Sequence, residues 1–350
     1  MMVRTLGLIV VCASTAGACK SGDEGSGGDT GSDSGASSSP TNTSTAGMDT
    51  DAPTTGDSAT GGTTEMPDPT AGEFPCSPKA SCEAAQPACI GLIDNTGAAT
   101  YALRMSQLMF SKPGALTSGL LVGLLNTALL PDLPACNLAG QGTWSWLLQF
   151  DTGAGTLRTG AGLPMADPFA GYSFIDDANS SPAVMDAPVS GDGKFAAATG
   201  VDLVMPIGLG PGLEINLPMR GLLLSGTVSA DQSCIGTFNA EGLDPANSCL
   251  ADDENPTFVN GGTMSAHVLL TDADTIEIAP LGLTLCVLLS GDPATYGDGA
   301  KPISRCTRDA DAQIVFKGDW CHSTNKAADA FCFDSVLLTA DFAASSVKLN

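Results

Sequence analysis

The segment that decides the fold class is residues 144–150, which read WSWLLQF. Its large apolar side chains recur at every second position, the period at which the side chains of a β-strand share one face. Residues 151–155 (DTGAG) are typical of a turn, and residues 156–159 then supply a returning strand. The pattern predicts a β-hairpin with one buried face, formed by Trp144, Trp146, Leu148 and Phe150.

Further segments of the chain show the same alternation, with turn residues between them. In one of them apolar residues share a face from Met264 to Leu270, and His267 falls on the other face. A turn at residues 230–232 predicts a second hairpin, with residues 234–238 returning. The fold class expected is therefore mainly β, an antiparallel sandwich or barrel-like sheet. The other alternating segments are 201–205, 222–228 and 275–278.

One segment, residues 115–130 (ALTSGLLVGLLNTALL), predicts a helix instead, and Pro131 ends it. It is too short to span a bilayer comfortably. We expect a buried Leu-rich helix packed on the sheet. A membrane-touching helix and the wall of an apolar ligand pocket are the alternatives.

Ten cysteines follow residue 74, an even number that predicts a disulfide-stapled domain in an oxidising compartment. No CxxC motif occurs, and Cys321-His322 has no further ligand at metal-site spacing, so we expect neither a metal nor a cofactor. Local pairs are expected between Cys234 and Cys249 and between Cys321 and Cys332. The ten are Cys76, Cys82, Cys89, Cys136, Cys234, Cys249, Cys286, Cys306, Cys321 and Cys332.

The charge balance excludes some partners. The chain of 350 residues has 38 acidic residues against 14 Lys and Arg, a net charge of −24. A protein must bring cations to phosphates, so this balance argues against binding nucleic acid and against electrostatic docking on anionic lipid. Only two histidines are present, which leaves little room for His-based catalysis.

The N-terminus is typical of an export signal. Residues 1–18 contain Arg4, a short apolar run at 6–13 and small residues after it. The sequence Ala16-Gly17-Ala18-Cys19 (AGAC) resembles a bacterial lipobox, although Ala16 stands where leucine is usual. The resemblance implies that Cys19 is acylated with lipid and becomes the mature N-terminus.

Residues 19–73 are expected to form a lipidated, disordered tether. More than half of residues 20–73 are Gly, Ser or Thr, and Leu, Ile, Val and aromatic residues are absent. Such a segment has nothing to bury that would offset its ordering entropy. Its repeats TTGD and TGGTT resemble the leaders of myxobacterial lipoproteins. A cysteine-rich, mainly β domain is then expected at residues 74–350.

Motifs that carry chemistry are scarce in the sequence. It contains no GxSxG or HExxH motif, and the SxxK matches at 323–326 and 345–348 lack their companion motifs. The acidic pairs Asp272/Asp274 and Asp309/Asp311 and the run at 252–254 are expected to be solvated turns, with a structural Ca²⁺ as the alternative. We therefore expect no enzymatic activity.

The sequence predicts an exported, lipid-anchored protein of the bacterial envelope, at the outer membrane or cell surface, with a non-catalytic binding or structural role. Its membrane contact is the N-terminal lipid, and its ligand, whether protein, glycan or apolar molecule, is left open. The stretches GTWSWLLQFDTGAG and CIGTFNAEGLDPANSC resemble uncharacterised myxobacterial lipoproteins, which implies no activity. An apolar-ligand carrier and a carboxylate-based hydrolase are the alternatives.

Overall fold

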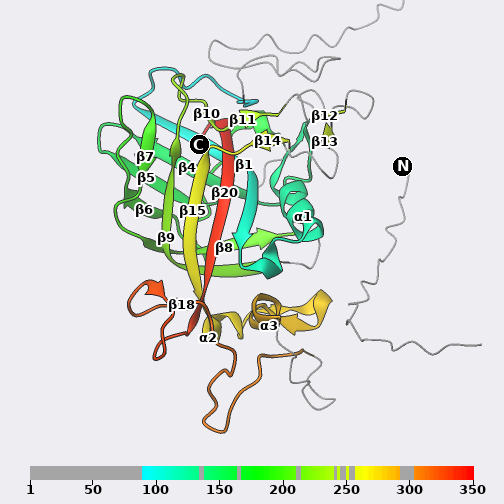
Figure 1. Ribbon diagram of the computed structural model, residues 1–350. Coiled ribbons are helices and arrows are strands. Elements are labelled where there is room, and N and C mark those ends of the chain that lie inside the picture. Colours follow the sequence, from blue (N-terminus) through cyan, green and yellow to red (C-terminus); the bar gives the residue numbers. More distant parts are fainter. Residues whose placement is uncertain are drawn as a thin grey trace, which may run out of the picture. The chain divides into compact units, whose positions relative to one another are not determined.

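The computed structural model describes residues 89–133, 138–163, 167–209, 214–239, 243–244, 250–251, 257–291 and 303–350. The expected signal peptide, the tether and the start of the domain lie outside the described residues. The described part is mainly β, and its antiparallel sheet forms a half-barrel (Figure 1), which confirms the fold class. None of its helices is long and apolar enough to cross a membrane. The cysteines outside the described residues are Cys12, Cys19, Cys76, Cys82, Cys136 and Cys249.

Eight strands follow one another across the main sheet. In order they are β6 (Ala183–Asp186), β5 (Thr156–Gly162), β4 (Ser145–Asp151), β1 (Thr100–Lys112), β20 (Ser335–Val347), β15 (Gly262–Leu269), β9 (Glu214–Thr227) and β7 (Lys194–Ala196). Four more strands join this sheet: β8 (Val201–Gly208) pairs with β9, β10 (Cys234–Ile235) with β20, and β18 (Trp320–Cys321) with β20 and β19 (Lys326–Ala327).

Short strand pairs and helices surround the sheet. The pairs are β2 (Asp132–Leu133) with β3 (Leu138–Ala139), β11 (Thr237–Phe238) with β14 (Phe258–Val259), β12 (Leu243–Asp244) with β13 (Leu250–Ala251), and β16 (Glu277–Ile278) with β17 (Leu283–Thr284). The helices are α1 (Gly119–Leu129), α2 (Leu270–Ala273) and α3 (Leu285–Ser290), with 3₁₀ turns at Gly114–Leu116, Pro168–Ala170 and Ala279–Leu281.

The sheet is curled, and two hydrogen bonds join segments at its opposite ends. The Ser180 hydroxyl donates to the Val204 carbonyl on β8 at 3.0 Å. The Ala198 amide donates to the Asp186 carbonyl on β6 at 3.0 Å. Inside the curl the alternating side chains expected from the sequence form the main core, which is filled by buried residues such as Trp146, Phe150, Met205, Met264 and Phe342.

The opposite, outer face of the sheet is also covered along its middle strands. A second apolar cluster there joins Ala102 on β1 and Val347 on β20 to Leu92 and Phe258 from segments that cross over them. Both faces of β1 and β20 are therefore buried. These two neighbouring strands of 13 residues each lack the alternation of polar and apolar residues that signals a strand.

The helix expected at residues 115–130 is present as a 3₁₀ turn followed by α1. It lies beside the second half of β1 (Figure 1), past Arg104, where the pairing with β4 ends. Its Asn126 side chain accepts a hydrogen bond from the Leu108 amide at 2.8 Å and donates to the Leu108 carbonyl at 3.0 Å. Leu125 and Leu129 join the core while Leu124 is 45% exposed, so the helix is buried along one side only.

Three disulfides staple the described part: Cys89–Cys234, Cys286–Cys306 and Cys321–Cys332. The last pair was expected, whereas the expected Cys234–Cys249 pair is wrong. Cys234 lies on β10, which pairs along β20, and the Leu92 amide donates to the Ser346 carbonyl of β20 at 2.8 Å. This places Cys89 beside Cys234. The hairpin expected at 230–238 is likewise reduced to its turn and one bridge, from Val228 to Ile235.

Candidate functional site

A cavity of about 210 Å³ lies on the outer face of the sheet, between β1, β4 and the end of α1. We call it the Arg104 cavity. It is lined by Arg104, Pro131, Asp132, Gln141, Gly142, Ser145, Pro168 and Tyr172. Nothing in the sequence patterns singled out these residues as a site.

Arg104 occupies an outer-facing position on β1, between the core residues Leu103 and Met105. It is only 2% exposed, although arginine is rarely buried without an ionic partner. Its Nη1 donates to the Leu129 carbonyl at 2.8 Å, and the guanidinium lies 5.9 Å from the centre of the Tyr172 ring. Its buried Nε has no hydrogen-bond partner among the described residues.

The Leu129 bond has a structural explanation. The carbonyls at the end of a helix lack partners within it and need others. Here the segment after β3 supplies most of them: the amides of Gln141, Gly142 and Thr143 donate to Thr127, Leu130 and Ala128 respectively. Arg104 supplies the partner for Leu129. This cap uses one of the five N–H groups of the guanidinium.

The charge of Arg104 has no carboxylate partner within the described part of the chain. Burial lowers the pKa of the guanidinium, and the Tyr172 hydroxyl opposes that shift. Arginine does not lose its proton in proteins, so the side chain is a buried cation. Asp132 lines the same cavity and yet makes no ion pair with Arg104. Placing an ion in a protein interior costs several kcal/mol, which the helix carbonyl and the aromatic ring offset only in part.

A larger hollow, of about 460 Å³, also lies on the outer face, over β20, β15 and β9. Its hydroxyls already bond to one another, with Ser111 and Thr339 at 2.8 Å and Ser225 and Thr263 at 2.7 Å. It is open and holds no buried charge. We therefore regard the smaller Arg104 cavity as the better ligand site. The larger hollow has a mixed lining of apolar and hydroxyl side chains and is open to solvent, whereas a lipid-like ligand is bound in an enclosed, mostly apolar pocket.

The structure brings together the two histidines, which the sequence placed in no common context. His267 Nε2 and His322 Nδ1 lie 2.8 Å apart. The sequence spacing near Cys321-His322 gave no sign of this contact, because His267 is 55 residues away along the chain. Burial and the neighbouring His322 lower the pKa of His267.

The acidic pairs have structural partners. Arg220 bonds Asp202 at 3.1 Å and Asp272 at 3.0 Å. Although burial opposes it, hydrogen bonds from the Gly221 amide and Arg220 hold the pKa of Asp202 below its usual value. A glycoside hydrolase needs an acid whose pKa is raised, so Asp202 does not fit that role.

Asp309 accepts hydrogen bonds from the amides of Asp311 and Gln313, as expected of a turn. The run at 252–254 lies outside the described residues.

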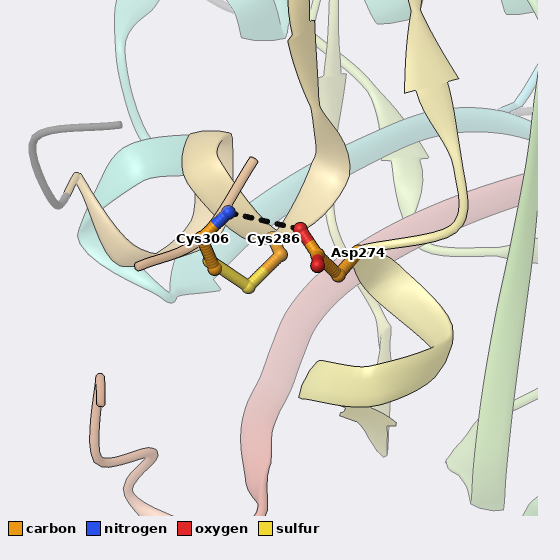
Figure 2. A group of neighbouring side chains, drawn as sticks. All are labelled: Asp274, Cys286 and Cys306. Carbon is orange, nitrogen blue, oxygen red and sulfur yellow. Dashed lines mark hydrogen bonds between the residues drawn. A yellow bond between two sulfur atoms is a disulfide. The ribbon is translucent and has the colours of Figure 1, made fainter. Parts of the chain in front are cut away.

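Asp274 is buried, contrary to the expectation of a solvated turn. Figure 2 shows it beside Cys286 and Cys306, whose sulfurs are bonded to each other and so unavailable as thiolate ligands. Asp274 accepts from the Cys306 amide at 2.9 Å and pairs with Arg308 at 2.7 Å. This group fixes the disulfide and the loop rather than a metal.

Comparisons with protein families, curated proteins and solved structures found no match for the chain. The function therefore has to be argued from the chain's own residues.

Proposed function

We propose that this chain is an exported, lipid-anchored envelope protein whose β domain binds a small carboxylate in the Arg104 cavity, without catalysis. One observation carries the proposal: Arg104 is a buried cation that lines a cavity and makes no ion pair with a carboxylate of the described chain. A ligand that brings the missing negative charge would complete the site.

The chemistry of the lining favours a monocarboxylate. The planar guanidinium matches the two oxygens of a carboxylate in a paired hydrogen bond. Ser145, Gln141 and Tyr172 add side chains able to donate hydrogen bonds. Asp132 disfavours a doubly charged anion such as phosphate, because like charges repel. The volume is that of roughly seven water molecules, which suits a short carbon chain.

The test is binding of acetate, propionate and lactate to the full mature chain, measured by calorimetry and by thermal melting against sodium chloride at equal ionic strength. A ligand that binds only the folded state raises its stability by about 2.7 kcal/mol at a hundredfold excess over Kd. We expect at least one of these carboxylates to raise the melting temperature and Arg104→Gln to weaken its binding at least tenfold.

Arg158→Gln is the matched control. Arg158 also lies over an aromatic ring, Phe174 at 4.4 Å, but does not line the cavity. It should bind the carboxylate like the unchanged chain. Equal binding by Arg104→Gln, or no stabilisation by any of the three carboxylates, would refute the proposal.

The anchor is tested separately. The AGAC sequence at residues 16–19 and the tether after it support lipidation of Cys19. Cys19→Ala should lose incorporation of labelled palmitate and move from the membrane fraction to the soluble fraction. Unchanged membrane association of this variant would remove the anchor from the proposal and leave the ligand site untouched.

A further inference from the structure

His322 directly follows β18, which pairs with the first residue of β20. Figure 1 shows β18 at the lower end of β20. His267 points away from the core, since its neighbours Ala266 and Val268 face inward on β15. The β18–β19 hairpin covers it and carries His322. We call His267, His322, Trp320 and Asn325 the histidine clasp.

Several contacts fix the clasp. The Cys321–Cys332 disulfide closes the loop that holds His322. The His322 amide donates to the Asp334 carboxylate at 2.9 Å, and the Trp320 indole donates to the Asn325 side chain at 3.1 Å. Gly221 has a φ of 59°, a backbone conformation that favours glycine, and lies against both His267 and Asn325. The two imidazoles are therefore held in place by the fold.

We propose that His267 and His322 together bind a late first-row divalent metal ion, with Cu²⁺ as the preferred ion. Imidazole is a ligand suited to copper, nickel and zinc, and Cu²⁺ has the highest affinity for such nitrogen sites. The two imidazoles are hydrogen-bonded to each other in this structure, so their nitrogens already face one another. His267 is 3% exposed and His322 is exposed, so solvent reaches one side of the pair.

The ring positions fit a shared metal. The facing nitrogens lie 2.8 Å apart and the ring centres 5.1 Å apart, as in a direct hydrogen bond. Cu²⁺ favours tetragonal geometry, in which two neighbouring nitrogen ligands on bonds of about 2.0 Å also lie about 2.8 Å apart. The nitrogens therefore have the spacing of a Cu²⁺ site, and each ring has only to tilt so that its lone pair points at the shared ion. The proton between them moves to the other nitrogen of its own imidazole. Each ring stays neutral and presents a lone pair.

Water would fill the remaining positions. Within the described residues the pair has no third His, Cys, Asp or Glu at ligand distance. The charges of Asp202 and Asp334 act on His267 in favour of a cation, and the charge of Arg220 acts against it. Such a site is weaker than a structural zinc site, and its open positions leave it accessible to a further ligand.

The experiment uses the full chain, purified without a polyhistidine tag, and Cu²⁺ as the probe. The Trp320 ring centre lies 6.4 Å from that of His267, while Trp144 and Trp146 are in the core, so bound Cu²⁺ should quench the Trp320 emission. Electron paramagnetic resonance should show nitrogen hyperfine coupling from two imidazoles. We expect His322→Gln, at an exposed position, to weaken binding at least tenfold and to lose this two-nitrogen signal.

Three controls make the result decisive. Lys326→Gln changes an exposed side chain on the same hairpin and should bind Cu²⁺ normally. Trp320→Phe should remove the quenching but retain the resonance signal. Ca²⁺ prefers oxygen ligands and should produce no quenching. Equal Cu²⁺ affinity in His322→Gln, or a signal from fewer than two imidazoles in the unchanged chain, would overturn the proposal.

Discussion

The Arg104 cavity and the histidine clasp lie on the same outer face of the sheet. Each contains a buried basic side chain, but the two side chains respond differently to burial. Arg104 is 2% exposed and His267 is 3% exposed. Histidine releases its proton when burial disfavours the charge, and His267 then shares a hydrogen bond with His322. Arginine keeps its charge. Of these two regions, only the Arg104 cavity therefore contains a buried positive charge that an external anion would neutralise.

The disulfides nearest to the two regions constrain the chain over very different sequence separations. Cys234 pairs with Ser345 on β20, and Ser345 pairs with Arg104 on β1, so Cys89–Cys234 lies two strands from Arg104. Cys321–Cys332 closes only the loop that carries His322. The cavity is thus tied to the global fold, whereas the clasp is tied to one local loop.

The largest expected effect tests that contrast. Cys89→Ala with Cys234→Ala should lower the free energy of unfolding by about 5 kcal/mol, and Cys321→Ala with Cys332→Ala by about 3 kcal/mol, in the chain-entropy model. The reason is the sequence separation of the paired cysteines, 145 residues in the first case and 11 in the second. Urea denaturation of both double variants under oxidising conditions measures the difference.

The same variants separate the two regions functionally. Removing Cys321–Cys332 should abolish Cu²⁺ quenching and leave carboxylate binding unchanged. Loss of carboxylate binding in that variant would show that the two regions are coupled, which contradicts the local character assigned to the clasp.

A second prediction extends the comparison to a buried polar group inside the half-barrel. Burial raises the pKa of Tyr101 to about 12, and its hydroxyl has no hydrogen-bond partner among the described residues. The neutral phenol is favoured in the folded state, so this contribution is present below pH 10 and is lost as the pH rises through 12. At pH 11 a shift of this size corresponds to about 1 kcal/mol.

Tyr101→Phe should therefore resist alkaline unfolding better than the unchanged chain, with a difference that grows between pH 10 and 12. Urea denaturation at pH 8 and pH 11 measures it. Tyr172→Phe is the comparison from the outer face, where Tyr172 belongs to the second apolar cluster and also lines the Arg104 cavity. If the stability difference between Tyr101→Phe and the unchanged chain were smaller at pH 11 than at pH 8, the expected pH dependence would be contradicted.

The third prediction concerns the charge of Arg104 in the absence of ligand. Arg104→Met removes a buried cation that lacks a carboxylate partner and retains much of its apolar volume. Replacing buried charges by apolar groups is often neutral or stabilising. We expect the free energy of unfolding to rise by about 1 kcal/mol. The gain is smaller than the cost of burying the charge, because the Leu129 carbonyl loses its hydrogen-bond donor.

The stability gain should coincide with loss of carboxylate binding, as expected where function is maintained at the expense of stability. Urea denaturation and calorimetry on the same preparation measure both. If Arg104→Met lowers stability by more than 2 kcal/mol, the cap on α1 is the main role of this residue.

The sequence predicted the strands that alternate, including β4, β5, β8 and β15, because each shows a period of two that points its apolar residues to the core. It did not reveal β1 or β20, since both of their faces are buried. The Cys89–Cys234 bond was missed for a related reason: its partners meet through pairing with β20, which no local spacing encodes.

The candidate sites were less predictable than the fold. Arg104 gave one signal, a charged residue within the apolar segment YALRMSQLMF, but its burial depends on α1, which is separate in sequence. His267 was correctly placed on the polar face of its strand. Its contact with His322 required the fold of the β18–β19 hairpin, so the sequence alone left the two histidines apart.

The smallest expected effect concerns Asp132, the other charged residue in the Arg104 cavity. Asp132 is exposed and does not pair with Arg104, so its charge acts on a ligand through partly solvated space, where interactions are worth about 1 kcal/mol or less. Asp132→Asn should therefore raise acetate affinity by about threefold, and sulfate affinity by more, because sulfate carries two charges. Calorimetry at low ionic strength gives both affinity ratios, and added salt should reduce them.

Asp177→Asn, which changes an exposed carboxylate outside the cavity, controls for net charge. If Asp132→Asn weakens acetate binding instead, the Asp132 carboxylate holds the ligand directly. The ligand would then have to carry a donor or positive group as well as its carboxylate.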